Sequence, residues 1–231
     1  MKFFEEGSIS SNPNRGDFLI FYRLNARTAS EVTSEWGEKY ASISKKLKAL
    51  EYTINEKGFK LYLSDEKTFK VLNHNDMWIP NIMFKYQEKM LQEVLFLDFQ
   101  LSYFGSPGVD LNYLLYGSVQ DKVRETSMKD LIYEYHTELS VALENLNYKQ
   151  NCPTLQDIHE EISKTAFHAV NTALCLVPLS MVSNEESAEM DVFLADTSKG
   201  NAYRKKILMN TKCSNILKKL FLEFDSAGLL D

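Results

Sequence analysis

Apolar residues recur at intervals of three or four along much of the chain, which is the spacing of one face of an α-helix. The first sustained pattern covers residues 30–50, with Ser30 as its predicted N-cap and Glu31 in the first turn. Gly37 lies inside this pattern and weakens it, because glycine disfavours helix interiors. We expect an amphipathic helix here, preceded by a polar, turn-rich segment over residues 1–15.

Three further helices are predicted downstream. Their expected ranges are 127–146, 155–178 and 216–224. Thr154 and Asp157 form a capping-box pattern at the start of the second helix, Pro178 ends it, and Gly228 follows the third. The acidic, polar residues 183–199 predict a surface loop. Helices therefore dominate the expected fold.

Two β-prone runs, at residues 82–86 and 94–99, flank a short polar segment and predict a β-hairpin. An antiparallel pair returns the chain to its starting point, so Asn81 before the first strand and Asp98 at the end of the second should lie side by side. The predicted class is α+β, mainly α-helical with a small β-hairpin.

Composition narrows the class of protein. The chain has 231 residues, of which 44% are hydrophobic and 25% charged, enough for one large or two small domains. The formal net charge of −6 leaves no basic surface for nucleic acid. No run approaches the roughly 20 apolar residues of a membrane span, and no signal peptide is visible. We expect a soluble, cytoplasmic enzyme with no nucleic-acid or membrane partner.

The three cysteines are Cys152, Cys175 and Cys213. Their odd number and wide spacing fit neither a disulfide framework nor a zinc site. Reduced thiols are the expected state.

One stretch carries candidate chemistry. His74-Asn75-Asp76-Met77-Trp78-Ile79-Pro80-Asn81 is followed by Asp98-Phe99-Gln100 at the end of the predicted hairpin. Phosphoryl transfer needs an oriented acceptor hydroxyl and metal ions that neutralise the phosphates. The spacing His-x-Asp-x-x-x-x-Asn places Asp76 to orient the hydroxyl and accept its proton, with Asn81 and Asp98 as oxygen ligands for Mg²⁺. The pattern is weak alone and stronger with the strand-borne Asp98.

Residues 71–78, 81–86, 97–100 and 105–111 together resemble the insect ecdysteroid kinase-like family, also called CHK kinase-like, which is related to choline kinases and aminoglycoside phosphotransferases. The resemblance is dense over residues 69–116. The closing residues 224–230 are also similar to the family's end. The resemblance implies ATP- and Mg²⁺-dependent phosphorylation of a small-molecule hydroxyl, with ecdysteroids or xenobiotics processed in detoxification as the substrate class.

The resemblance also implies roles for single residues. Asp76 holds the position of the catalytic base, and His74 belongs to the catalytic loop in a structural role. Asn81 and Asp98 hold the positions that bind the metal and, through it, ATP. The family usually has glycine where this chain has Asn75, and asparagine tolerates the left-handed backbone better than most residues. Pro80 should stiffen the loop.

Related enzymes carry an N-terminal lobe with a Gly-rich loop and a phosphate-binding lysine, and neither is visible before His74. We therefore expect residues 1–29 to be a loop or truncated lead-in and residues 30–231 to be a kinase-like C-terminal catalytic lobe, with the N-terminal lobe absent. The surface facing that lobe should be apolar and exposed, which predicts self-association.

Other interpretations stay open. Asp76, Asn81 and Asp98 are also common turn-forming residues at strand ends. Asp110 is a candidate third metal ligand, but we favour a structural role in which it holds the motif loop through backbone hydrogen bonds. Trp78 and Tyr103 are candidate substrate contacts or, by preference, packing residues.

At the level of function, the alternatives are a non-catalytic kinase-like remnant that binds a ligand or partner, and a purely structural helical domain. The tyrosines near the motif, Tyr113 among them, are expected mostly in the core, with some hydroxyls facing an acceptor pocket.

Overall fold

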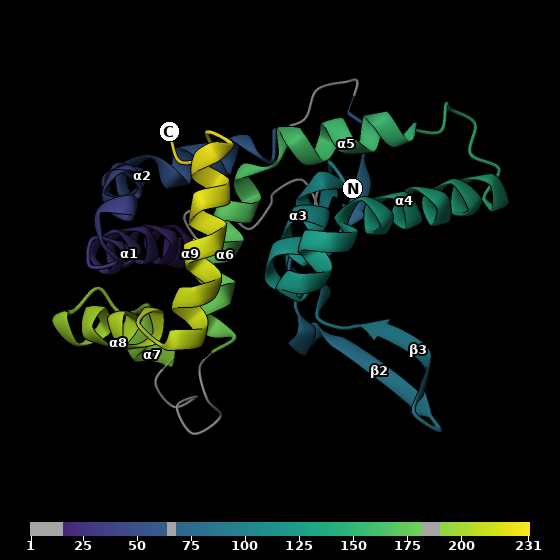
Figure 1. Cartoon of the computed structure of the whole chain (residues 1–231). Coiled ribbons are helices and arrows are strands. Elements are labelled where there is room, and N and C mark those ends of the chain that lie inside the picture. The colour runs from purple at the N-terminus through teal and green to yellow at the C-terminus, as the bar shows by residue number, and fades with distance from the viewer. Residues whose placement is uncertain (1–15, 64–67, 182–189) are drawn as a thin grey trace. The chain divides into compact units, whose positions relative to one another are not determined.

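Helices and two small two-stranded sheets make up the computed structural model, which describes residues 16–63, 68–181 and 190–231 (Figure 1). The chain divides into two compact units. Leu61–His168 form one, called here the motif unit, and residues 16–60 together with Ala169–Asp231 form the described part of the other, the helical unit.

The described part of the helical unit consists mainly of α-helices. They are α1 (Gly16–Thr33), α2 (Ala41–Lys60), α6 (Phe167–Leu179, which begins in the motif unit), α7 (Met190–Leu194), α8 (Ser198–Leu208) and α9 (Thr211–Ser226). α1 packs along α2, and Ser30 and Ser44 exchange hydrogen bonds between side-chain hydroxyl and backbone carbonyl at 2.9 Å in both directions. Fully buried apolar side chains such as Leu24, Leu47 and Phe221 form its core.

The prediction of one helix over residues 30–50 is wrong. The helix is interrupted at Gly37, whose φ of 96° is a conformation that glycine adopts readily and other residues adopt only with strain. A short 3-10 turn (Glu38–Tyr40) then precedes α2. The apolar spacing continues across this break because α1 and α2 pack against a common core.

Residues 16–29, expected to be part of a loop or truncated lead-in, are helical and belong to α1. Their apolar pattern is interrupted by buried polar residues: Asn25 donates to Phe21 O (3.0 Å) and Thr28 to Leu24 O (2.8 Å). These local bonds let polar side chains occupy the buried face. Residues 1–15, predicted to be polar loop, lie outside the described residues.

The predicted loop over residues 183–199 is also wrong in part. Residues 182–189 lie outside the described residues, and the remainder contains α7 and the start of α8. Thr197 caps α8 by accepting from Gly200 N at 3.0 Å. The buried guanidinium of Arg204 donates to Phe193 O (2.6 Å) and Ala195 O (2.9 Å), which holds the end of α7.

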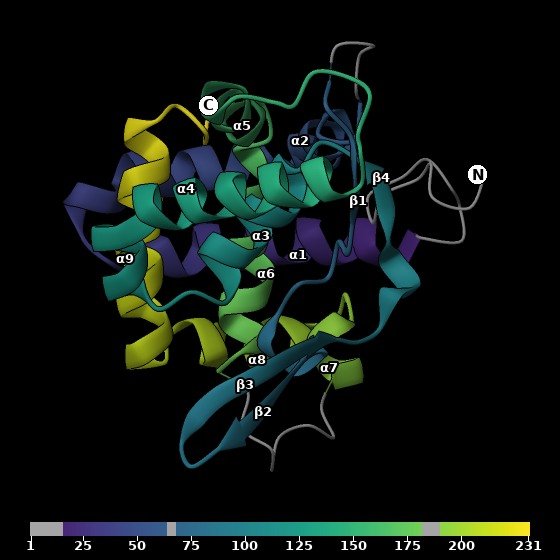
Figure 2. The ribbon, with the colours of Figure 1, turned by 90° about the vertical axis from the view of Figure 1, so that its right-hand side faces the viewer.

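The described part of the motif unit contains three complete α-helices and four short strands. The helices are α3 (Gly108–Gly117), α4 (Asp121–Asn145) and α5 (Leu155–Lys164). The strands are β1 (Val71–Asn73), β2 (Ile82–Gln87), β3 (Met90–Phe96) and β4 (Tyr103–Gly105). β1 pairs antiparallel with β4, as Figure 2 shows, and β2 pairs antiparallel with β3. The predicted hairpin and the α+β class are confirmed.

The helices of the motif unit share a core of Leu111, Leu115, Ile132 and Ile158. α3 and α5 approach closely at Gly108, where a Cβ would collide with the side chain of Thr165 and the carbonyl of Glu161. The capping box of Thr154 and Asp157 is confirmed, with the Thr154 hydroxyl accepting from Asp157 N at 3.1 Å.

The long helix predicted over residues 155–178 is divided into α5 and α6. Asn112 of α3 donates to Ile162 O (3.0 Å) and to the hydroxyl of Thr165 (3.0 Å), and the Thr165 hydroxyl donates to Glu161 O (2.8 Å). These bonds satisfy carbonyls at the end of α5 and let the chain turn there. Pro178 lies within the last turn of α6.

The three cysteines carry free thiols, as expected; Cys152 is exposed, and Cys175 and Cys213 are buried. Among the described helices, none combines the length and apolar character of a membrane span.

Candidate active site

α3 holds the loop that follows β1. The carboxylate of Asp110, in the first turn of α3, accepts hydrogen bonds from the backbone N–H groups of His74 (2.6 Å) and Asn75 (2.8 Å). The side-chain oxygen of Asn73 accepts from Asp110 N at 3.2 Å. Burial raises the pKa of Asp110, while the two backbone N–H groups act in the opposite direction by stabilising its anion. The structural role preferred for Asp110 is confirmed.

Asn75 takes the left-handed backbone conformation expected of it, with φ of 64°. Its side chain is also used: its oxygen accepts from the Tyr62 hydroxyl (3.1 Å) and its nitrogen donates to Leu101 O (3.1 Å). A glycine would supply the conformation and lose both hydrogen bonds. Asn75 is therefore an anchor as well as a turn residue.

His74 connects the loop to the hairpin. Its Nε2 lies 2.6 Å from Leu97 O, and because a carbonyl only accepts, Nε2 carries the hydrogen. The imidazole is buried and packs on the ring of Phe99, with the centroids 4.7 Å apart. Leu97 N in turn donates to Asn81 O at 2.9 Å. Both backbone polar groups of Leu97 are thus held by the motif, which fixes the residue directly before Asp98.

The half-buried Asp76 is held at both carboxylate oxygens. Its Oδ1 accepts from the Tyr113 hydroxyl at 2.7 Å, and its Oδ2 accepts from Asn81 Nδ2 at 2.9 Å. Asn81 Nδ2 also donates to Asp76 O at 2.9 Å. The two bonds from Asn81 close the loop of four residues between Asp76 and Asn81.

The same contacts orient the Asn81 amide. Both partners of its nitrogen are acceptors, so the nitrogen must face Asp76 and the amide oxygen must point elsewhere. An amide oxygen is a suitable ligand for Mg²⁺. Pro80 lies in the short 3-10 turn (Ile79–Asn81) that leads into β2, as expected of a stiffened loop.

Asp98 follows β3 and takes the left-handed conformation, with φ of 62°. Its side chain is exposed, and its Oδ2 accepts from Gln100 Nε2 at 3.1 Å. Register pairs Ile82 with Phe96, and the bond from Leu97 N to Asn81 O extends this pairing. Asn81 and Asp98 therefore lie at neighbouring strand ends, as the hairpin predicted.

The donor set fits a magnesium ion held by few protein ligands. Within the described ranges no group of three His, Cys, Asp or Glu side chains is arranged to hold a metal. Asn81 and Asp98 would supply one amide oxygen and one carboxylate, and Mg²⁺ commonly completes its shell with water and phosphate oxygens. Asp110 takes no part, since its carboxylate is used by the loop backbone.

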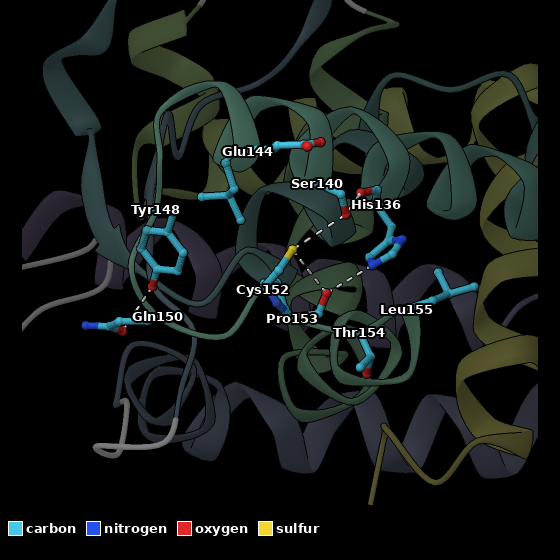
Figure 3. Close-up of a pocket in the computed structure, with 10 residues that line it drawn as sticks. His136, Ser140, Glu144, Tyr148, Gln150, Cys152, Pro153, Thr154 and Leu155 are labelled. Atoms are coloured by element: carbon cyan, nitrogen blue, oxygen red, sulfur yellow. Dashed lines mark hydrogen bonds between the residues drawn. The ribbon is translucent and has the colours of Figure 1, made fainter.

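Two cavities lie elsewhere in the motif unit. One of about 550 Å³ is lined by α4, the following loop and the start of α5, including His136, Cys152 and Pro153 (Figure 3). His136 Nε2 donates to Pro153 O at 3.0 Å inside it. A neighbouring cavity of about 1000 Å³ is lined by Lys70 and Lys164 among others. Neither includes a residue of the motif loop.

The sequence singled out Asp76, Asn81, His74 and Asp98 as candidates but did not predict the two tyrosine hydroxyls that bind this loop. Tyr113 is buried, as expected of a core tyrosine, and its hydroxyl donates to Asp76. The available signal was its position three residues after Asp110, on the same face of α3. Tyr103 is a packing residue as preferred: it is buried, and its hydroxyl donates to Tyr62 O at 2.6 Å.

Comparison with known proteins gives one match. The model of the ecdysteroid kinase-like family matches residues 1–148, a stretch that contains the whole motif and all of α3 and α4. No curated protein and no solved structure matches the chain. The closing residues 224–230 lie outside the family match. Since the match covers more than half of the sequence, the chain belongs to the ecdysteroid kinase-like family.

Proposed function

We propose that this protein transfers a phosphoryl group from ATP to a hydroxyl group of a small molecule, with Mg²⁺ as the metal. The observation that carries the proposal is the arrangement of Asp76 and Asn81, in which the carboxylate is clamped and the amide oxygen is turned away from it. Membership of a kinase-like family supports the reaction class. The kinase-like fold of the motif unit is part of the same proposal.

Asp76 is the residue that orients the acceptor. Two of the roughly four lone-pair positions on its carboxylate are taken by Tyr113 and Asn81, so the others accept the hydroxyl of the substrate. As the acceptor oxygen bonds to the γ-phosphorus and the bond to the ADP oxygen breaks, the hydroxyl proton passes to Asp76. Fixing the acceptor in line with the phosphate contributes to the acceleration together with electrostatic stabilisation of the phosphate charge.

Asn81 and Asp98 are the residues that would hold the metal. When it is bound, Mg²⁺ would neutralise negative charge on the phosphate oxygens. His74 keeps the two ligands in register by holding Leu97 O, and Gln100 holds one oxygen of Asp98. These contacts from His74 and Gln100 keep Asn81 and Asp98 in position before the metal binds.

The acceptor belongs to the ecdysteroid or xenobiotic alcohols in this proposal. Ile79 and Phe99, both about half exposed, provide apolar surface beside the motif for a hydrophobic substrate. ATP-dependent chemistry and free thiols fit a cytoplasmic location.

Self-association is proposed as well, through the β2–β3 hairpin. Three of its large apolar residues, Phe84, Tyr86 and Leu95, are 42–62% exposed. The hairpin projects from the helices of its unit (Figure 1). An exposed apolar surface of this kind favours contact with another protein surface.

The proposed function is tested by nucleotide binding. Isothermal titration with ATP should show binding that requires Mg²⁺, and Asp98→Ala should weaken it strongly because one carboxylate ligand is removed. Asp130→Ala, an exposed acid on α4, is the matched control and should bind as the unaltered protein does. Equal binding with and without Mg²⁺, or by Asp98→Ala and the control, would count against the metal assignment.

A second candidate is a non-catalytic module that binds a ligand or partner. The exposed apolar hairpin is the observation that favours it. A protein that retains self-association but binds no Mg²⁺–ATP would support this candidate over a kinase.

A further inference from the structure

The side chain of Tyr113 connects the core of the motif unit to the proposed catalytic base. Its hydroxyl donates to Asp76 Oδ1 at 2.7 Å, and its ring, carried by α3, is buried. A hydroxyl donating to an ionised carboxylate forms a charge-assisted hydrogen bond, which is shorter and stronger than a neutral one. The distance is in the range of such bonds.

The ring of Tyr113 cannot move freely. It packs against the buried imidazole of His168, with centroids 5.6 Å apart, and His168 also packs against Tyr62 at 6.3 Å. Tyr62 binds the side chain of Asn75 in the motif loop. The aromatic cluster of Tyr62, Tyr113 and His168 therefore contacts the loop at two successive residues, Asn75 and Asp76.

Two donors at opposite oxygens fix a carboxylate better than one. The bond from Asn81 holds only Oδ2 of Asp76. With this bond alone, the orientation of the carboxylate would depend on the conformation of the loop. Tyr113 is borne by α3, which is anchored to the loop by Asp110 and again at its end, where the Ser118 hydroxyl donates to Met77 O at 3.3 Å. The second donor thus comes from a rigid element and not from the loop itself.

We propose that Tyr113 is a positioning residue that sets the direction in which Asp76 receives the acceptor hydroxyl. This inference rests on the proposed phosphoryl transfer. Tyr113 acts through Asp76, so its removal lowers the rate of the bound complex and leaves nucleotide binding by Asn81 and Asp98 intact. Loss of the bond should reduce kcat by about tenfold or more, as expected for one hydrogen bond to a charged group.

The test compares Tyr113→Phe with Tyr203→Phe, a tyrosine of the helical unit that is equally buried at 7% exposure. We expect Tyr113→Phe to lower kcat by about tenfold or more with the KM for ATP unchanged within about twofold. Tyr203→Phe should leave both constants unchanged. A kcat equal to that of the unaltered protein would overturn the inference, and so would a rise in the KM for ATP with kcat retained.

A readout without turnover separates this inference from the proposed function. The side-chain amide signals of Asn81, identified by their loss in Asn81→Asp, report the carboxylate that their nitrogen binds. Tyr113→Phe should shift these signals and Tyr203→Phe should not. If the unaltered protein shows no kinase activity, shifted signals still support positioning of Asp76 by Tyr113, and unshifted signals overturn it. The double variant Tyr113→Phe, Asp76→Asn should be no slower than Asp76→Asn alone; a further loss would contradict action through Asp76.

Discussion

Oδ1 of Asp110 lies 2.8 Å from the backbone nitrogen of Asn75, and this bond joins the first turn of α3 to the loop that carries the proposed catalytic base. Its companion is the bond from His74 N to Oδ2. Both carboxylate oxygens are therefore used to hold two successive backbone groups. The loop shape depends on an acid that lies more than thirty residues away in sequence.

Replacing Asp110 by asparagine should destabilise the loop. One oxygen becomes an NH₂ group that faces a backbone N–H, so one hydrogen bond is replaced by a contact between two donors. Removal of a buried charge acts in the opposite direction, since burial raises the pKa of Asp110. We expect the lost bonds to dominate, with a decrease of about 1–3 kcal/mol in unfolding free energy. Urea unfolding measures it, with Asp130→Asn as the exposed control.

Faster hydrogen exchange at the amides of His74 and Asn75 should accompany this change. Unaltered exchange at these two amides in Asp110→Asn would contradict the account of the loop.

Asn75→Gly and Asn75→Ala separate the two contributions of Asn75. Both variants lose the side-chain bonds to Tyr62 and Leu101, and only alanine must also strain to adopt φ of 64°. We expect Asn75→Gly to decrease unfolding free energy by about 1 kcal/mol and Asn75→Ala to decrease it by about 1–2 kcal/mol more. Urea unfolding of both is the measurement. An alanine variant as stable as the glycine variant would be inconsistent with the left-handed conformation.

His168 should make stability depend on pH in weakly acidic solution. Burial lowers its pKa from 6.5 to about 4, so between these values the unfolded chain binds a proton that the folded chain does not. Stability therefore falls as pH decreases from 6.5 toward 4, by about 3 kcal/mol in all for this group.

His168→Leu removes the titrating group and should flatten this part of the curve, as measured by urea unfolding at several pH values. The corresponding change at the partly exposed His159, His159→Leu, serves as the control and should keep the slope. A slope that His168→Leu leaves unchanged would show that other groups produce it.

Lysine substitutions in the hairpin test the proposed self-association. Register pairs Met83 with Leu95 and Phe84 with Val94, so Phe84 and Leu95 lie on opposite faces of the β2–β3 pair. Phe84→Lys with Leu95→Lys should therefore disrupt contacts made by either face. Sedimentation should show an average mass that rises with concentration for the unaltered protein and stays near the monomer for this variant.

The control pair is Tyr52→Lys with Leu146→Lys, at exposed apolar positions outside the hairpin, 73% and 78% exposed. This pair should associate as the unaltered protein does. If the unaltered protein remains monomeric at high concentration, the proposed self-association is contradicted.

The sequence predicted the parts of the site whose spacing is local. Asp76 and Asn81 are five residues apart in one loop, and the hairpin pattern brought Asp98 to the same place because strand pairing is readable from alternating β-prone runs. The contacts of Tyr113 and Tyr62 with the loop were not predicted, because they depend on how α3 and the segment before β1 pack on the loop. Such contacts between distant segments leave no periodic signal in a single sequence.

The fold was predicted in the same uneven way. Helix α4 and the capping box of α5 follow from strong local patterns. The failures at α1 and at the division of α5 from α6 come from buried polar residues such as Asn25 and Asn112, whose hydrogen bonds replace apolar packing. A hydrophobic pattern cannot show whether a polar residue finds a partner in the core.

The most direct test of the central claim is phosphorylation itself. The protein is incubated with Mg²⁺–ATP and a panel of ecdysteroids and small alcohols, and the phosphorylated product is measured by mass spectrometry. We predict a product with at least one acceptor and a loss of about 10²–10⁴-fold in kcat for Asp76→Asn, with Asp130→Asn unchanged. Product formed equally fast by Asp76→Asn would contradict the role of Asp76, and no product with any acceptor would contradict the kinase activity.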